Sequence, residues 1–268
     1  MRLILLVASI LVLSVSISLY VLTEQTDRYF AWTIGLPLTA AFLGSGYGAS
    51  FLLEYLSSQE RTWARARLAV PAVLLFTTLT LIATLLHLEP FHFDSPHLIT
   101  RAGTWVWMIV YGGVPPALAL VWWHQARQPG GEPPVMAPLP GWMRLLLTSQ
   151  AAVMLLLGVA LFLWPTAVAP TWPWALTALT SRVVGAWLVG IGTIAAHAAW
   201  ENDWVRLENM MISYLAFAVL QFIALLRYPE AMAWESPSAW LYVLFQLTVL
   251  GVGLYGWLAA RRTRQNLT

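Results

Sequence analysis

The sequence predicts an all-α integral membrane protein of eight transmembrane helices, arranged as two tandem four-helix units with both termini in the cytoplasm. Three observations support this prediction. First, 59% of the 268 residues are hydrophobic and only 10% are charged, whereas soluble domains carry about 25% charged residues. Second, the chain contains eight apolar stretches, each near the ~20 residues that span a bilayer as a helix. Third, the second half repeats the first at a shift of 141 positions.

The eight apolar stretches lie at 2–22, 33–56, 66–87, 103–124, 144–164, 179–200, 207–227 and 239–260. A backbone in lipid must satisfy its own hydrogen bonds, so stretches of this length are expected to be helices. Barrel strands would be about half as long and would alternate polar with apolar residues. The first stretch begins like a signal peptide, but its apolar run is longer than usual, so we expect a retained helix.

The repeat defines the predicted domain organisation. The 141-residue shift matches Gly44 with Gly185 and the acidic–Trp–Arg turn at 60–65 with that at 201–206, and a later shift of 135 pairs Trp105 with Trp240. The two units are residues 1–127 and 142–268, joined by a proline- and glycine-rich cytoplasmic linker at 128–141. Because each unit holds four helices, both enter the membrane in the same direction, related by a pseudo-twofold axis along the membrane normal.

Matched segments also predict where two helices begin. The sequences Asp94-Ser95-Pro96 and Glu235-Ser236-Pro237 each combine an acidic residue, serine and proline. These residue types suit the first turn of a helix. They are therefore expected to start the fourth and eighth helices.

Arginine distribution predicts the orientation of the chain. With the termini on one side, that side holds ten of the fourteen basic residues and the opposite side holds four. By the positive-inside rule, the richer side is cytoplasmic, which suggests a bacterial inner membrane. The ten are Arg2, Arg61, Arg65, Arg67, Arg127, Arg144, Arg206, Arg261, Arg262 and Arg264; the four are Arg28, Arg101, Arg182 and Arg227.

The second helix of each unit is rich in small residues. Gly44 and Gly48 share one face of the first such helix, and Gly185, Gly190 and Gly192 recur in the other. Small residues allow helix backbones to approach closely in lipid. We expect both helices to pack tightly, and to meet each other at the pseudo-twofold axis.

Two absent residue types exclude several chemistries. Without cysteine the chain forms no disulfide, iron–sulfur cluster or thiol nucleophile. Without lysine it forms no retinal or pyridoxal Schiff base and no Walker-type phosphate loop. There is also no extended basic patch with interleaved aromatic residues, so nucleic acid is not an expected partner.

The loop between the third and fourth helices holds the densest group of metal-ligating residue types. Three imidazoles and two carboxylates within eleven residues suit zinc or copper, although the spacing follows no known ligand pattern. The alternative is a group of solvated loop histidines, because the matching loop of the second unit has none. The residues concerned are His87, Glu89, His92, Asp94 and His97.

Two further histidines are candidates for a bound pigment. His124 and His197 lie at similar depth near the ends of the fourth and sixth helices. Together they suggest a haem, and individually a chlorophyll magnesium. Each is also favourable on its own at a helix C-terminus, so a structural role is the alternative. No cofactor is otherwise predicted.

Charged or helix-bending residues inside the apolar stretches are the remaining candidates. Arg182 lies about one turn into the sixth helix and is expected to snorkel or to pair with Glu230 or Glu235. Glu54 lies near the cytoplasmic end of the second helix, with Arg61 a turn or two away. In the fourth helix, Gly112-Gly113-Val114-Pro115-Pro116 predicts a kink that frees backbone carbonyls, as at transporter sites.

One segment carries a resemblance to known sequences. Residues 172–187 read W-P-W-A-L-T-A-L-T-S-R-V-V-G-A-W, and an acidic–Trp–Arg turn follows at 201–206. The segment resembles a group of uncharacterised bacterial multi-pass membrane proteins with a W-P-W-x-L-T-x-L-T-x-R-x-x-G-A-W pattern. The resemblance implies a polytopic membrane protein and no particular activity.

Function is predicted mainly from what the helix centres lack. The middle third of each stretch holds no ionisable residue, and no arrangement suits a catalytic triad or carboxylate pair, so an enzyme is not expected. The leading expectation is a non-enzymatic accessory or structural subunit, in contact with lipid and other membrane subunits or forming a homo-oligomer. The alternative is a transporter or channel for a small neutral or lipophilic solute, and a metal or pigment binder comes third.

Overall fold

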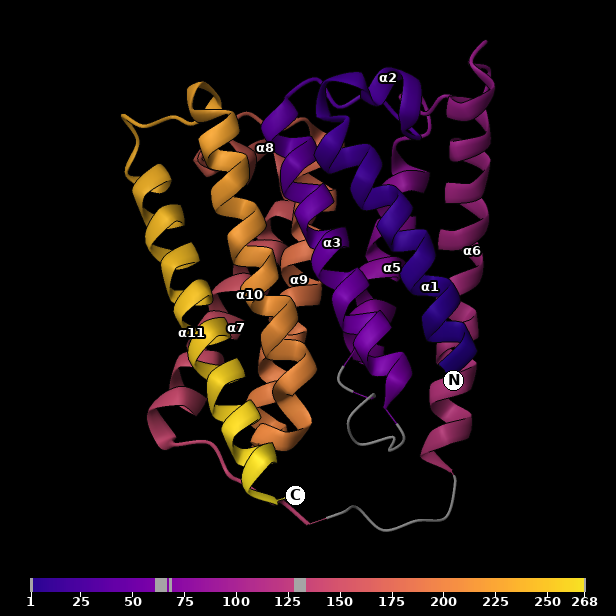
Figure 1. Ribbon diagram of the computed structural model, residues 1–268. Helices are drawn as coiled ribbons and strands as arrows, with labels where there is room; N and C mark the ends of the chain where they lie inside the picture. The colour runs from indigo at the N-terminus through magenta and orange to yellow at the C-terminus, as the bar shows by residue number, and fades with distance from the viewer. Residues whose placement is uncertain (1, 61–66, 68, 128–133, 268) are drawn as a thin grey trace.

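The computed structural model describes residues 2–60, 67, 69–127 and 134–267, so Arg61, Trp63 and Arg65 of the sequence argument lie outside it (Figure 1). Within these ranges the chain is helical, apart from one isolated bridge between Trp32 and Phe91. The long helices run roughly side by side, and both termini lie toward the same end of the bundle (Figure 1). The predicted all-α class is confirmed.

Eight long helices correspond to the eight apolar stretches. They are α1 (Arg2–Ser16, continued by the π-helical η1, Ile17–Val21), α3 (Pro37–Gln59), α5 (Ala69–Leu86), α6 (Leu98–Ala126), α7 (Gly141–Leu163), α9 (Ala178–Glu201), α10 (Trp204–Arg227) and α11 (Pro237–Leu267). Short turns connect them: η2 (Thr23–Gln25), α2 (Thr26–Tyr29), α8 (Pro165–Val168), η3 (Ala169–Thr171) and η4 (Pro229–Ala231).

Six of the described helices are long and apolar enough to cross a membrane, namely α5, α6, α7, α9, α10 and α11. The N-terminal helix adds a seventh if it is joined to the segment Thr23–Tyr29, from which it is bent by 94°. A multi-pass membrane protein is therefore supported, while a count of eight is not reached. The helix α3 differs because it carries glycines, serines and a glutamate, and most of its residues are buried by protein. Such a helix does not need the apolar surface that lipid requires.

Four helices form the centre of the bundle. The sequence neighbours α1 and α3, α5 and α6, α7 and α9, and α10 and α11 pack as pairs, while α3 contacts α10 and α5 contacts α9. The central helices are thus α3, α5, α9 and α10. Burial follows this arrangement, since 72% of the most apolar part of α9 is buried inside the protein, against 22% for α6.

The small-residue faces of α3 and α9 pack tightly, as predicted. A Cβ atom added to Gly44 would lie 2.7 Å from the backbone nitrogen of Tyr20, and one added to Gly185 would lie 2.6 Å from the carbonyl oxygen of Gly158. Each glycine therefore packs against the helix that precedes its own. The helices α3 and α9 also meet each other, since a Cβ atom added to Gly46 would lie 3.0 Å from the ring of Trp187, but each contacts the partner unit chiefly through α10 or α5.

Predictions about α6 and α11 were partly correct. The helix α11 begins at Pro237, and Ser236 Oγ accepts a hydrogen bond from the N–H of Ser238 at 3.3 Å. The matching Ser95 Oγ accepts from the N–H of His97 at 3.2 Å, but α6 begins only at Leu98. The prolines at 115 and 116 lie inside α6, which continues through them as one α-helix. The run 112–116 therefore does not end the helix, and the kink expected there stays a prediction.

Candidate ligand-binding cavity

The loop residues predicted to bind a metal ion do not converge. His92 Nε2 lies 2.9 Å from Thr33 Oγ1, and His92 Nδ1 lies 3.1 Å from the carbonyl oxygen of Phe30, so both ring nitrogens are engaged within the protein. Across the described ranges, no three histidine, aspartate or glutamate side chains are placed to hold a metal ion. The structure thus assembles no metal centre from His87, Glu89, His92, Asp94 and His97.

The two candidate pigment ligands lie on different helices. His124 is exposed near the end of α6. His197 lies on α9, with its Nε2 atom 3.4 Å from Glu201 Oε1. The helix α5 packs against both α6 and α9. A haem or chlorophyll site at these two histidines stays a prediction.

Arg182 contacts the first half of the chain instead of the predicted glutamates. Its Nη1 atom lies 2.7 Å from His87 Nε2, just beyond the end of α5, whereas Glu230 and Glu235 are exposed. The expected pairing with these glutamates is wrong. Burial and the adjacent Arg182 guanidinium lower the pKa of His87. The neutral imidazole is the form that accepts a hydrogen bond from arginine.

A buried ionic cluster joins the halves at the opposite end of α5 and α9. Glu201 Oε1 accepts a hydrogen bond from Arg67 Nε at 2.5 Å, and Glu201 Oε2 accepts one from Arg206 Nη1 at 2.6 Å. Asp203 Oδ2 accepts from the N–H of Met136 at 2.9 Å, which docks the end of the linker onto the same turn. Sequence reasoning assigned Glu201 and Arg206 to an interfacial turn and missed Arg67, which belongs to no repeated motif.

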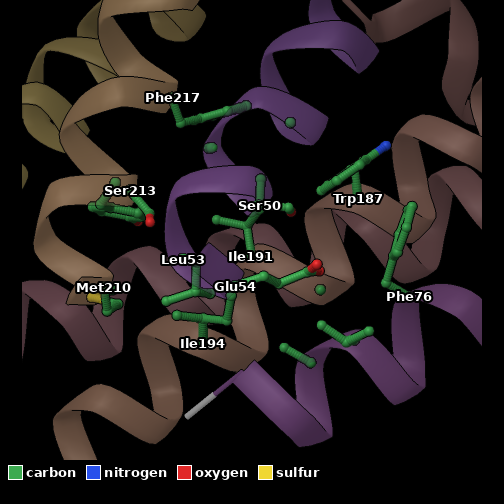
Figure 2. Close-up of a pocket in the computed structure, with 16 residues that line it drawn as sticks. Ser50, Leu53, Glu54, Phe76, Trp187, Ile191, Ile194, Met210, Ser213 and Phe217 are labelled. Carbon is green, nitrogen blue, oxygen red and sulfur yellow. The ribbon is translucent and has the colours of Figure 1, made fainter. Parts of the chain in front are cut away.

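A cavity lies between the four central helices (Figure 2). Its volume is about 60 Å³, which exceeds the ~10–15 Å³ that one water requires. The wall is mainly aliphatic and aromatic, and the ring centroids of Phe76 and Trp187 lie 4.1 Å apart on one side. The lining residues are Gly46, Ala49, Ser50, Leu53, Glu54, Ala72, Val73, Phe76, Trp187, Gly190, Ile191, Ile194, Met210, Ser213, Tyr214 and Phe217.

Glu54 contributes the one carboxylate of this wall. It extends from α3, and its carboxyl group points toward the side where Trp187 and Phe76 lie (Figure 2). The residue is only 4% exposed, and its Oε2 atom is buried without a hydrogen-bond partner. Among the described residues, none forms a salt bridge with it; the candidate neighbour Arg61 is outside those ranges. Buried carboxylates are normally paired, so this one suits a ligand.

The wall of the cavity follows the internal repeat. Seven pairs of lining residues differ by 141 positions: Gly46 and Trp187, Ala49 and Gly190, Ser50 and Ile191, Leu53 and Ile194, Ala72 and Ser213, Val73 and Tyr214, Phe76 and Phe217. The position that matches Glu54 is Ala195. The cavity therefore has a nearly twofold wall with one acidic side. The sequence analysis did not predict this cavity, although Phe76 and Phe217, which match at the repeat shift, could have indicated it.

Comparison with protein-family models, curated protein sequences and solved structures found no match for this chain.

Proposed function

We propose that the chain is an eight-span membrane protein built from two parallel four-helix units, residues 1–127 and 142–268. The helix contacts support this arrangement, since the α1–α3 pair corresponds to α7–α9 and the α5–α6 pair to α10–α11. The contacts between the units follow the same symmetry: because α3 corresponds to α9 and α10 to α5, the α3–α10 contact corresponds to the α9–α5 contact. The two spans beyond the six apolar helices are α1 with η1, and α3.

The proposed orientation places both termini in the cytoplasm of a bacterial cell, in the inner membrane. The ten-to-four arginine distribution supports it. Because the chain has no cysteine, single cysteines report position directly. A membrane-impermeant maleimide should label Asp94→Cys in intact spheroplasts, and should label Asn266→Cys only after permeabilisation. Labelling of both variants in intact spheroplasts would contradict the proposed eight spans.

We propose that the protein transports a small, predominantly apolar solute without catalysing a reaction on it. The observation that carries this proposal is the apolar cavity between the central helices of the two halves, with the unpartnered carboxylate of Glu54 in its wall. Transporters built from repeats place the solute near the midplane, where the repeats meet. The geometry thus favours the transport alternative over the accessory role.

Filling the cavity tests this function. Ala49→Phe adds a ring to the wall, whereas Val153→Phe adds one at a site on α7 that is 50% exposed. Neopentane, a small neutral hydrocarbon, should bind wild-type protein and Val153→Phe in lipid nanodiscs, and Ala49→Phe should abolish its binding. Equal binding by the two variants would place the solute outside the cavity.

An accessory subunit remains the second candidate function, and one observation favours it. The helix α6 packs mainly on α5 and is the least buried of the six apolar helices. Its exposed side carries Trp105, Trp122 and Trp123, a residue type enriched at binding interfaces as well as at membrane interfaces. Native mass spectrometry of gently extracted protein tests this reading, because a bare monomer would contradict it and a mass that includes other subunits would support it.

A further inference from the structure

The chemistry of the cavity narrows the class of solute. Building on the transport function, we propose that the cavity binds an organic cation: a small, largely apolar molecule with one amine or quaternary ammonium group that is held by Glu54. Four features of the site favour such a ligand: the unpaired carboxyl group, the aromatic wall, the small number of other oxygen ligands, and the second cavity beside Glu54.

Among the described residues, none provides a counter-charge for the carboxylate of Glu54. In this part of the chain the wall of the cavity has no arginine or histidine, and the salt bridges involve other acidic residues, at 27, 201, 203 and 208. A buried charge is costly unless it is paired and hydrogen-bonded. Without a partner the buried carboxyl group favours its neutral form, whereas a bound cation favours the ionised carboxylate and pairs with it; a hydrocarbon of the same shape does neither.

The aromatic rings around the carboxylate suit a cation. Phe76 and Trp187 lie on the side toward which Glu54 points (Figure 2), and Phe217 lines the wall as well. A cation over an aromatic face gains roughly 0.5–2 kcal/mol. The hydroxyl group of Tyr214 donates to Gln150 Oε1 at 3.1 Å, so that residue presents its ring to the cavity. The described arginine–ring contacts lie elsewhere, at rings 20, 123, 200, 228 and 257.

The same wall does not suit a metal cation. Calcium takes 6–8 oxygen ligands, and magnesium requires octahedral oxygen coordination. Apart from Glu54, the side-chain oxygens of the wall are the hydroxyls of Ser50, Ser213 and Tyr214. Ser213 donates to the carbonyl oxygen of Asn209 at 3.1 Å, and Tyr214 is engaged as described. One carboxylate among apolar side chains instead matches a cation that carries its own hydrocarbon.

A second cavity reaches Glu54 from the direction of α1 and α6. Its volume is about 120 Å³, and its wall of aliphatic residues from α1, α5 and α6 shares Glu54 and Val73 with the central cavity. A lipophilic cation can cross such a wall, whereas a hydrated ion would lose its water there without replacement. Glu54 therefore lies between two apolar cavities. A solute that is both charged and lipophilic would gain the most binding free energy there, because it combines apolar contact with a charge that pairs with Glu54.

Two isosteric probes test the proposal. Tetramethylammonium and neopentane are small enough to suit these cavities, and they differ by the replacement of a cationic nitrogen with carbon. Their dissociation constants are measured by equilibrium dialysis against protein in nanodiscs, with empty nanodiscs subtracted. The cation should bind wild-type protein and the control Glu235→Gln with equal affinity. Its affinity for Glu54→Gln should be at least about 10-fold lower. Its affinity for Glu54→Asp should stay within a few-fold of that for wild type. Neopentane should bind Glu54→Gln as it binds wild type.

The outcomes separate this inference from the transport function. If neopentane binds in a manner blocked by Ala49→Phe while the cation binds no more tightly, the cavity is a solute site and the cation inference is overturned. Unchanged cation binding by Glu54→Gln overturns it too. If neither probe shows binding that Ala49→Phe blocks, the transport function fails as well. Thermal unfolding of each variant verifies folding, and the uncharged Glu54→Leu, in which leucine has a similar volume, replaces Glu54→Gln in the comparison if that variant does not fold.

Discussion

Replacing Glu54 by leucine tests whether this residue is retained for function or for stability. The side chain is 4% exposed, Oε2 has no hydrogen-bond partner, and the surrounding wall is largely apolar. An unsatisfied buried polar group costs about 1–3 kcal/mol, and more if it is charged. Leucine has a similar volume and no polar atom, so it removes this cost and adds apolar contact. Glu54→Leu should therefore increase the free energy of unfolding by about 1–3 kcal/mol.

The measurement is reversible unfolding in mixed micelles, followed by circular dichroism. Glu235→Leu is the control, because Glu235 is exposed and surface changes stay within about 0.5 kcal/mol. Most substitutions of buried residues destabilise a protein, so a gain in stability is a distinctive result. A loss of 1 kcal/mol or more in Glu54→Leu would mean that the carboxylate makes stabilising contacts, and the ligand argument would lose its basis.

Three further substitutions test other parts of the structure by the same unfolding measurement. Gly185→Ala should cost about 1–3 kcal/mol because its Cβ would lie 2.6 Å from a carbonyl of α7, while Gly251→Ala, with open space around it, should cost nothing. Glu201→Gln should cost about 3–5 kcal/mol by leaving two arginines without their carboxylate. The pKa of His87 is lowered from 6.5 in the folded protein, so the unfolded chain binds a proton at this residue more readily than the folded chain does. The free energy of unfolding should therefore fall as the pH drops below about 6.5, and Arg182→Gln should make that fall smaller.

The sequence predicted those features of the fold that depend on one segment of the chain, and not those that depend on contacts between distant segments. The eight long helices followed from apolar length, because a lipid-exposed backbone has few alternatives. Gly44 and Gly185 predicted close helix contacts, but not which helix they would meet. That choice depends on how the two halves dock, and the residues that decide it are far apart in sequence. The same reason explains why α10 and α5, not the two glycine faces, supply the main contacts between the halves.

The candidate site residues were likewise predictable from residue type, whereas their partners were not. Glu54 was visible as a charge in an apolar stretch, but its cavity was not, because the wall is assembled from four helices. The loop histidines suggested a metal site from composition alone, whereas the backbone turned His92 toward Phe30 and Thr33. Arg182 was recognised as unusual, yet its contact with His87 crosses between the halves. Residue type identified these candidates, and tertiary placement decided their partners.

Side-chain interactions join the ends of α5 and α9 on both sides of the bundle, and the two interactions differ in strength. At one end Arg67 meets Glu201, whose side chain is 1% exposed; at the other, Arg182 meets a neutral, partly exposed His87. A rocking motion that parts these helices at one end can leave the other end closed. Because breaking a buried ion pair is costlier than breaking one hydrogen bond to a neutral group, the bundle should yield first at the Arg182 end, so the resting molecule is already biased toward opening on one side.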